Sequence, residues 1–206
     1  MEAVAARPST EFKASFLAML DDFDLNDPEN AAFYAPARED FERYVRSLLD
    51  EEAGLNLKEN YVPCSHRWLL SPAREVVGVA RIRHRIDTPF LTENGGHIGY
   101  DIAPASRRKG YGHRAFAIAL REARCLGLAR VLMYAAEDNL ASRAVIERGG
   151  GILEGVAFSD FWQEQLCKYW VSVPAEALVL PPHNRTRPMR SLTPARRFGP
   201  VVDDDA

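Results

Sequence analysis

The first third of the chain repeats apolar and polar positions with the period of a helix. Residues 9–23 carry this pattern behind a Ser9/Thr10 cap, and residues 37–54 repeat it until Gly54. The apolar positions are Phe12, Phe16, Leu17 and Leu20 in the first segment, and Phe41, Tyr44, Val45 and Leu48 in the second. Residues 24–36 are polar and contain proline, which predicts a loop with a short helical turn. We therefore expect residues 1–60 to be mostly helical.

Strand patterns follow from residue 67 onward. Residues 67–71 and 75–86 are rich in apolar and β-branched side chains, and the turn-like residues 71–74 predict an antiparallel hairpin. In the second strand we expect Val77, Val79, Arg81 and Arg83 on one face, and Val76, Ala80 and Ile82 on the other or at a bulge near Gly78. Residues 88–96 predict a loop, and residues 97–103 predict the next strand.

The second half of the chain alternates helix and strand patterns. Residues 110–128 predict a helix that ends at Gly127, with a stripe of Phe116, Ala119, Leu120, Ala123 and Leu126. Residues 129–136 are apolar without alternation, which is typical of a strand buried on both faces. A short helix over residues 138–151 and a strand pair over residues 152–158 and 165–173 complete the pattern.

These elements predict a single α/β (α+β) domain, with a central, mostly antiparallel sheet flanked by helices. We divide the chain into a helical N-terminal part of the domain (1–60), a core (61–173) and a flexible Pro/Arg-rich tail (174–206). The length of 206 residues is enough for one proper core.

Composition narrows the function classes. The net charge of −3 gives no reason to expect a nucleic-acid partner, and no apolar run approaches the length of a membrane span. The three cysteines contain no CxxC pair, and His66 and His84 show no metal-ligand spacing with a third partner, so we expect no metal. The N-terminus lacks the features of a secretory signal, and we expect a cytoplasmic protein.

The segment 95–123 carries the candidate chemistry. A strand runs into Pro104, and the turn from Arg107 to Gly112 opens directly into a helix. A helix N-terminus attracts phosphate, and glycines allow close approach of the backbone, so this turn predicts a diphosphate cradle. No Lys-Ser/Thr follows the glycines as in a Walker loop. A dinucleotide fingerprint is matched only in degenerate form, by Gly110, Gly112 and Ala115.

The wider pattern resembles the GNAT superfamily of acetyl-CoA-dependent N-acetyltransferases. Arg107-x-x-Gly110-x-Gly112 matches the signature [RQ]xxGx[GA], and Ile102-Ala103-Pro104 precedes it as in the family. A buried strand, an Asn and a short helix ending in glycine follow in the family's order, as "RVLMYAAEDN", "ASRAVIER" and "GGGILEG". The resemblance covers roughly residues 62–173, and within the superfamily the sequence is similar to a subgroup of predicted acetyltransferases. It implies the fold and the cofactor but gives almost no information on the substrate.

This resemblance implies a splayed strand pair, 97–103 and 130–136, that admits the pantetheine arm of acetyl-CoA. The cofactor-binding residues it implies are Tyr100, Asp101 and Ile102 through their backbone, the turn Arg107, Arg108, Lys109, Gly110, Tyr111, Gly112 and His113, and Asn139. The N–H of Ile102 is the expected oxyanion donor. Asn139 is also an ideal helix cap, and both roles can coexist.

The acid and the base are not fixed by the motif. His97 and Glu93 are the candidate bases that would take a proton from the incoming amine. The family's usual tyrosine acid, seven residues after the Asn, is here Ile146, which cannot donate a proton. Tyr100, Tyr134 or Tyr169 would then substitute, or the thiolate leaves unaided.

The function implied is acetyl transfer from acetyl-CoA directly to a primary amine, through a tetrahedral intermediate. The acceptor is a small molecule or a peptide, with no membrane partner, and the family makes a homodimer reasonable. Two alternatives stay open: a CoA-binding sensor or interaction module without catalysis, and an NAD-type oxidoreductase.

Overall fold

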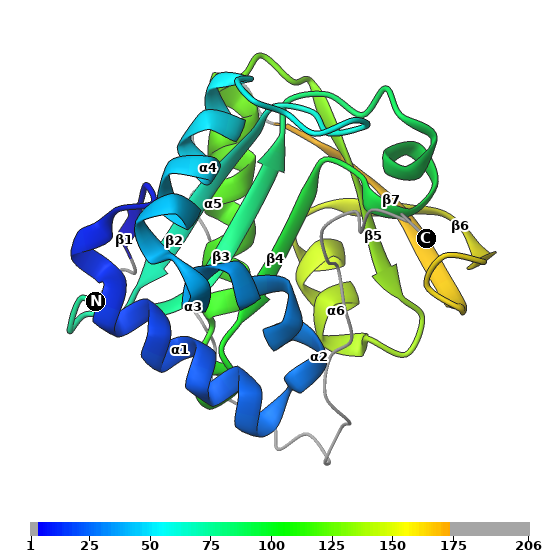
Figure 1. The fold of residues 1–206 in the computed structure, drawn as a ribbon. Helices are drawn as coiled ribbons and strands as arrows, with labels where there is room; N and C mark the ends of the chain where they lie inside the picture. Colours follow the sequence, from blue (N-terminus) through cyan, green and yellow to red (C-terminus); the bar gives the residue numbers. More distant parts are fainter. Residues whose placement is uncertain (1–3, 174–206) are drawn as a thin grey trace.

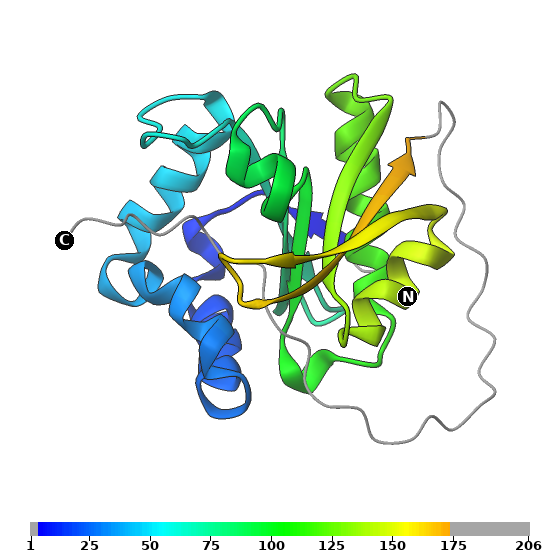
Figure 2. The ribbon, with the colours of Figure 1, turned by 90° about the vertical axis from the view of Figure 1, so that its right-hand side faces the viewer.

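Two antiparallel sheets form the centre of the molecule, where the sequence predicted one. The computed structural model describes residues 4–173. The first sheet has the order β1-β2-β3-β4, with β1 at Val4–Ala6, β2 at Cys64–Leu70, β3 at Val76–Arg83 and β4 at Ile98–Ile102. The second has the order β5-β7-β6, with β5 at Arg130–Ala136, β6 at Gly151–Ser159 and β7 at Glu164–Ser172. Figures 1 and 2 show β4 and β5 side by side at the line where the sheets meet.

Helices cover both faces of the first sheet (Figure 1). On one face lie 3-10 turns at Thr10–Phe12 and Ala32–Tyr34 and the helices α1 (Lys13–Asn26), α2 (Pro28–Ala31), α3 (Ala35–Glu39) and α4 (Phe41–Ala53). Their aromatic side chains pack on Trp68 of β2, and the rings of Phe16 and Trp68 are centred 4.5 Å apart. Ser9 accepts from the N–H of Glu11 and so caps the 3-10 turn that leads into α1, whereas α1 itself begins at Lys13 without a side-chain cap. Gly54 ends α4 in the left-handed region, as predicted.

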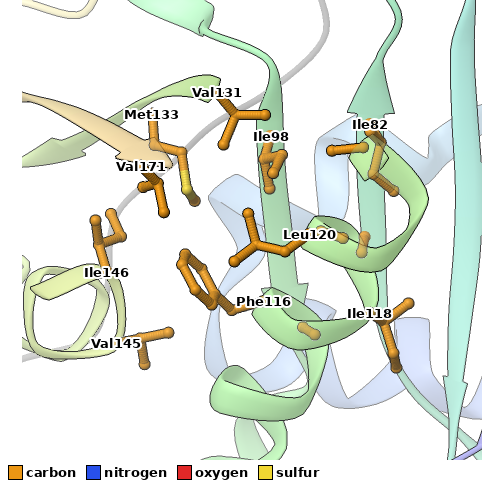
Figure 3. Close-up of a cluster of buried hydrophobic side chains, with 14 of the residues drawn as sticks. Ile82, Ile98, Phe116, Ile118, Leu120, Val131, Met133, Val145, Ile146 and Val171 are labelled. Carbon is orange, nitrogen blue, oxygen red and sulfur yellow. The ribbon is translucent and has the colours of Figure 1, made fainter. Parts of the chain in front are cut away.

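The opposite face is covered by α5 (Tyr111–Cys125), with α6 (Leu140–Arg148) beside it. Phe116 and Leu120 of α5 point toward Ile98 of β4 and Met133 of β5 (Figure 3), so this core is shared by the two sheets. Of the predicted stripe, Leu126 alone is exposed, because α5 ends one residue before it. None of the helices within residues 4–173 is long and apolar enough to cross a membrane.

The N-terminal segment contains the helices α1 to α4 but begins with the short strand β1, which pairs with β2 and was not predicted. The faces expected for Val76 and Val77 on β3 are exchanged. On β3, Val77 packs with Ala80 and Ile82 toward α5, whereas Val76 packs with Val79 toward the N-terminal helices. The register shift between Leu69 and Leu70 of β2 lies opposite Gly78 and Val76, where the sequence had left a bulge open, and it exchanges the faces of Val76 and Val77.

The two sheets are joined at one end of β4. The N–H of His97 donates to the carbonyl of Leu132 at 2.7 Å, and the N–H of Leu132 donates to Nδ1 of His97 at 2.9 Å. Among the described residues β4 and β5 form no ladder beyond this point, and the two strands run in the same direction and diverge (Figure 1). The backbones of β4 and β5 therefore separate from His97 toward Ile102 and Ala136, and we call this divergence of the two backbones the opening.

Gly96 makes this junction possible. Its φ is +62°, and a Cβ atom at this position would lie 2.5 Å from the carbonyl oxygen of Leu132. We expect Gly96→Ala to lower the free energy of unfolding by about 2–3 kcal/mol, through left-handed strain and displacement of β5. A thermal melt should show a fall in Tm of roughly 5–10 °C.

The matched control is Gly127→Ala, since Gly127 has a φ of +77° but open space around its Cβ position. This variant carries the backbone strain without the collision and should lose about 1 kcal/mol. Equal losses in the two variants would contradict a special role for the approach of Gly96 to Leu132.

Candidate functional site

The edge of β4 that faces β5 offers main-chain groups to the opening. Hydrogen bonds from Arg83 N to His97 O and from Ala103 N to Val77 O show which residues of β4 turn their main-chain N–H and C=O groups toward β3. Since residues of an antiparallel strand alternate between its two edges, Asp101 points its main chain toward β3. Tyr100 and Ile102 point theirs toward the opening. Of the three residues predicted to bind pantetheine through the backbone, two are thus oriented for it and Asp101 is not.

The predicted diphosphate cradle lies at the N-terminus of α5. Gly110 is the N-cap residue with a φ of +84°, and the first turn is closed by Arg114 N donating to Gly110 O at 3.3 Å. Arg108 also has a positive φ, +59°, so the turn is tightly curled. The first turn of a helix presents N–H groups with no acceptor inside the helix, and here Tyr111 and Gly112 occupy it. This geometry fits an anion.

The basic triplet of the turn acts mostly within the protein. Arg107 donates from Nε to the carbonyl of Ile102 at 3.0 Å and pairs with the buried carboxylate of Asp27. Lys109 donates to the carbonyl of Ala105 at 2.7 Å. Arg108 is exposed. The side chain of Arg107 therefore fastens the turn to β4 and to the N-terminal helices, whereas Arg108 and Lys109 are both exposed to solvent.

Tyr100 connects β4 with α6. Its hydroxyl lies 3.3 Å from Oγ of Ser142, and a Cβ atom on Gly112 would lie 3.8 Å from its ring. Asn139 caps α6, because its side-chain oxygen accepts from the N–H of Ser142 at 3.0 Å. Burial raises the pKa of Tyr100 to about 12, so the hydroxyl carries its proton at neutral pH. The start of α5, the middle of β4 and the start of α6 thus meet at one place.

Ile146, at the position of the family's usual acid, and Tyr169, one of the tyrosines considered in its place, are both part of the core. Ile146 is 1% exposed and packs in the cluster beneath α5 (Figure 3). Tyr169 donates to the carboxylate of Glu147 at 2.7 Å and accepts from Arg143, and burial raises its pKa to about 12. These contacts hold α6 against β7.

His97 is engaged in the junction between the sheets. Its Nδ1 accepts from Leu132 N, which places any proton of the neutral ring on Nε2. Burial, and then the neighbouring Arg83 guanidinium, lower the pKa of His97 to about 4. The ring is therefore neutral near pH 7, and its basic nitrogen is already occupied.

Acid is expected to weaken this junction. The pKa of His97 in the folded chain lies below the value of about 6.5 in an unfolded chain, so the unfolded chain takes the proton first. The contribution, at most about 3 kcal/mol, is complete above pH 6.5 and is lost as the pH falls through 4. Urea unfolding between pH 7 and 4 measures the loss. His97→Asn, whose amide oxygen can accept from Leu132, should lose less, and the same pH slope in both proteins would refute the assignment.

A pocket of ≈ 670 Å³ opens over the face of β5 that is turned away from α5. A single-turn π-helix at Leu91–Gly95 forms one wall, and the hairpin of β6 and β7 forms the other. The two walls are joined by Ser159, which donates to the side-chain oxygen of Asn94 at 2.5 Å. The charged and ring-bearing lining residues are Glu93, Tyr134, Glu154, Phe158, Asp160, Phe161 and Lys168. Glu93 is thus placed in a pocket, as a candidate base should be.

The sequence did not predict Glu154, Asp160 and Lys168 as pocket residues, because only the pairing of β6 with β7 brings them together. Lys168 pairs with Glu154 at 2.7 Å, so the four charged groups leave an excess of negative charge. Tyr134 donates its hydroxyl proton to the carbonyl of Thr92. Burial and the nearby Glu154 and Glu93 raise its pKa to about 12.

Asp101 has a different role from the predicted one. Its carboxylate accepts from Tyr34 and from Arg81, both at 2.6 Å, beneath the N-terminal helices. These buried contacts fix β4 to β3 and to the 3-10 turn that holds Tyr34.

Comparisons with known proteins agree on one family. The family model described as "Acetyltransferase (GNAT) domain" matches residues 15–152. A search of curated proteins gave no match.

Solved structures share the fold. The ribosomal-protein-S5-alanine acetyltransferase of Vibrio fischeri is 15% identical, with a TM-score of 0.62 over 85% of this chain and 95% of that one. A ribosomal L7/L12 alpha-N-protein acetyltransferase, solved with coenzyme A, is 15% identical, with a TM-score of 0.63 over 85% and 97%. The spermidine N-acetyltransferase of Vibrio cholerae, solved with CoA and spermine, is 12% identical, with a TM-score of 0.60 over 84% and 96%. With a family model matching more than half of its length, and with this fold, the chain belongs to the GNAT family of acetyltransferases.

Proposed function

We propose that this protein transfers the acetyl group of acetyl-CoA to a primary amine, and that the opening between β4 and β5 is the place of transfer. The observation that supports it is the presence of three features around this opening. They are the free edge of β4, the N-terminus of α5 on one side of the sheets, and the acidic pocket on the other side. An anionic cofactor and a cationic acceptor would then approach from opposite sides.

Backbone groups would make most of the contacts between this chain and acetyl-CoA. The N–H groups at the start of α5 would hold the diphosphate, and Arg108 would add its charge from the surface. The open edge at Tyr100 and Ile102 would bond the pantetheine arm. Bound acetyl-CoA supplies an activated acyl group, and the N–H of Ile102 would stabilise the negative charge that develops on its oxygen.

The acceptor would enter the pocket between the π-helix and the β6–β7 hairpin. Its carboxylates favour a cation, and Phe158 and Phe161 offer apolar surface to the carbon chain that carries the amine. A primary ammonium with a pKa near 10 must lose a proton before it can attack. We assign this step to Glu93 and assign His97 to the junction, because Nδ1 of His97 is occupied.

For the acid we propose Tyr100. Its hydroxyl reaches α6 at Ser142, one helical turn before Ile146, and so brings a tyrosine hydroxyl from β4 to the helix whose usual tyrosine position is Ile146. The hydroxyl would donate to the departing thiolate.

A thermal melt followed by a turnover assay tests the function. Acetyl-CoA at about 100 times its Kd should stabilise the protein by about 2.7 kcal/mol, or roughly 5–10 °C in Tm, and NAD should not. Release of free CoA is then measured with spermidine and with short peptides that have a free N-terminus, since polyamine and N-terminal acetyltransferases share the fold. Stabilisation without CoA release from any amine would favour the catalytically inactive alternative. No stabilisation by acetyl-CoA would exclude the proposal.

A further inference from the structure

We propose that Cys64, His66 and Glu51 form a binding site for a thiophilic divalent metal ion of the zinc class, outside the acetyl-transfer site. The three side chains come from two elements. Cys64 and His66 are two residues apart on β2 and therefore lie on the same face of the strand, and Glu51 is in the last turn of α4, which packs over that face. In sequence His66 has no third ligand at a useful spacing, and the fold supplies one.

The geometry of the donor atoms suits a metal. Sγ of Cys64, a ring nitrogen of His66 and a carboxylate oxygen of Glu51 all lie within 4.8 Å of one another, and Nε2 of His66 contacts Oε2 of Glu51 directly. Ligands bound to one tetrahedral zinc ion at about 2.0–2.3 Å are spaced similarly. Small side-chain shifts would place an ion between them, with one coordination position left for water.

The burial and the charge of these side chains also favour a metal ion. Cys64 and His66 are each 6% exposed, and a buried polar cluster needs partners for all its donors and acceptors. A thiolate and a carboxylate together neutralise a divalent ion, so the buried site would carry no net charge from the metal and its ligands. Arg83 lies opposite Cys64 on β3. Thiolate, imidazole and carboxylate are the ligands that zinc accepts.

None of these three residues lines the acidic pocket or the α5 turn. The metal would join the end of α4 to the start of β2, and so fasten the N-terminal helices to the sheet. The proposal is therefore independent of the acetyl-transfer reaction and can be tested on protein without substrate.

Cobalt is the probe, because Co²⁺ takes zinc sites and a thiolate bound to it gives a charge-transfer absorption band. We expect the full chain, freed of any affinity tag and stripped with chelator, to bind one equivalent of Co²⁺ with this band, and Zn²⁺ to displace it. Cys64→Ser should abolish the band, and Cys125→Ser, which changes an exposed thiol elsewhere, should keep it. Glu51→Gln, a change at a partly exposed side chain, should weaken Co²⁺ binding at least tenfold while the far-UV spectrum stays unchanged.

Zn²⁺ should also raise the Tm of the unmodified chain and leave that of Cys64→Ser unaffected. Absence of the charge-transfer band in the unmodified protein, or an equal band in Cys64→Ser, would overturn the proposal. Rapid alkylation of Cys64 that excess Zn²⁺ does not slow would overturn it too, and would identify the cluster as a reactive thiol–imidazole pair.

Discussion

Gly112→Asp raises the KM for acetyl-CoA on the order of 100-fold, if the N-terminus of α5 holds the cofactor's diphosphate. The new carboxylate would occupy the first turn of the helix, where the N–H groups await an anion, and would repel the diphosphate. The fold should tolerate the change, because a negative charge suits a helix N-terminus and the added Cβ would lie 3.4 Å from Val145, a contact that can relax. Steady-state kinetics with acetyl-CoA as the varied substrate measures the effect.

Two control variants separate the effect of the added charge from the effects of the added atoms and of their position in the chain. Gly112→Ala adds the Cβ atom alone and should raise KM by less than about tenfold. Ala129→Asp adds the same charge beyond the other end of α5 and should leave KM unchanged. If Gly112→Asp and Gly112→Ala behaved alike, or if the KM for acetyl-CoA stayed at its original value, the diphosphate would have to bind elsewhere.

The sequence was a good guide to the elements because their patterns are local. The period of the apolar residues predicts α1, α4 and α5, and the apolar run without alternation predicts β5. Both predictions are possible because the residues of a segment themselves show whether one face or both faces are buried. β1 was missed because three residues carry too short a pattern, and it becomes a strand only by pairing with β2.

The local structure of the turn before α5 was predicted better than the contacts of the candidate catalytic side chains. The glycines and the start of the helix are adjacent in the sequence, so the turn before α5 could be predicted from the sequence alone. By contrast, the role of His97 depends on a hydrogen bond to Leu132, a residue 35 positions away. The acidic pocket needs the hairpin of β6 and β7 to face the π-helix, and the Cys64 cluster needs α4 to lie over β2. Side-chain roles of this kind are set by tertiary contacts that a single sequence does not display.

The same contacts separate the two predicted bases. His97 and Glu93 are four residues apart, but one is 7% exposed and bonded to β5, and the other faces an open pocket. Changing each should therefore alter a different property. His97→Asn should act on stability and its pH dependence, whereas Glu93 should act on the reaction.

Glu93→Gln is expected to lower kcat by a factor of about 10²–10³ near neutral pH, because the acceptor ammonium loses the group that would take its proton. The loss should shrink as the pH rises toward about 10, where the amine loses its proton to water without help. Glu154→Gln is the matched control. It removes another carboxylate from the same pocket, one already paired with Lys168, and should raise the KM for the amine with little change in kcat. A kcat profile of Glu93→Gln parallel to that of the unmodified protein at every pH would remove Glu93 from the proton path and leave its charge as its only contribution.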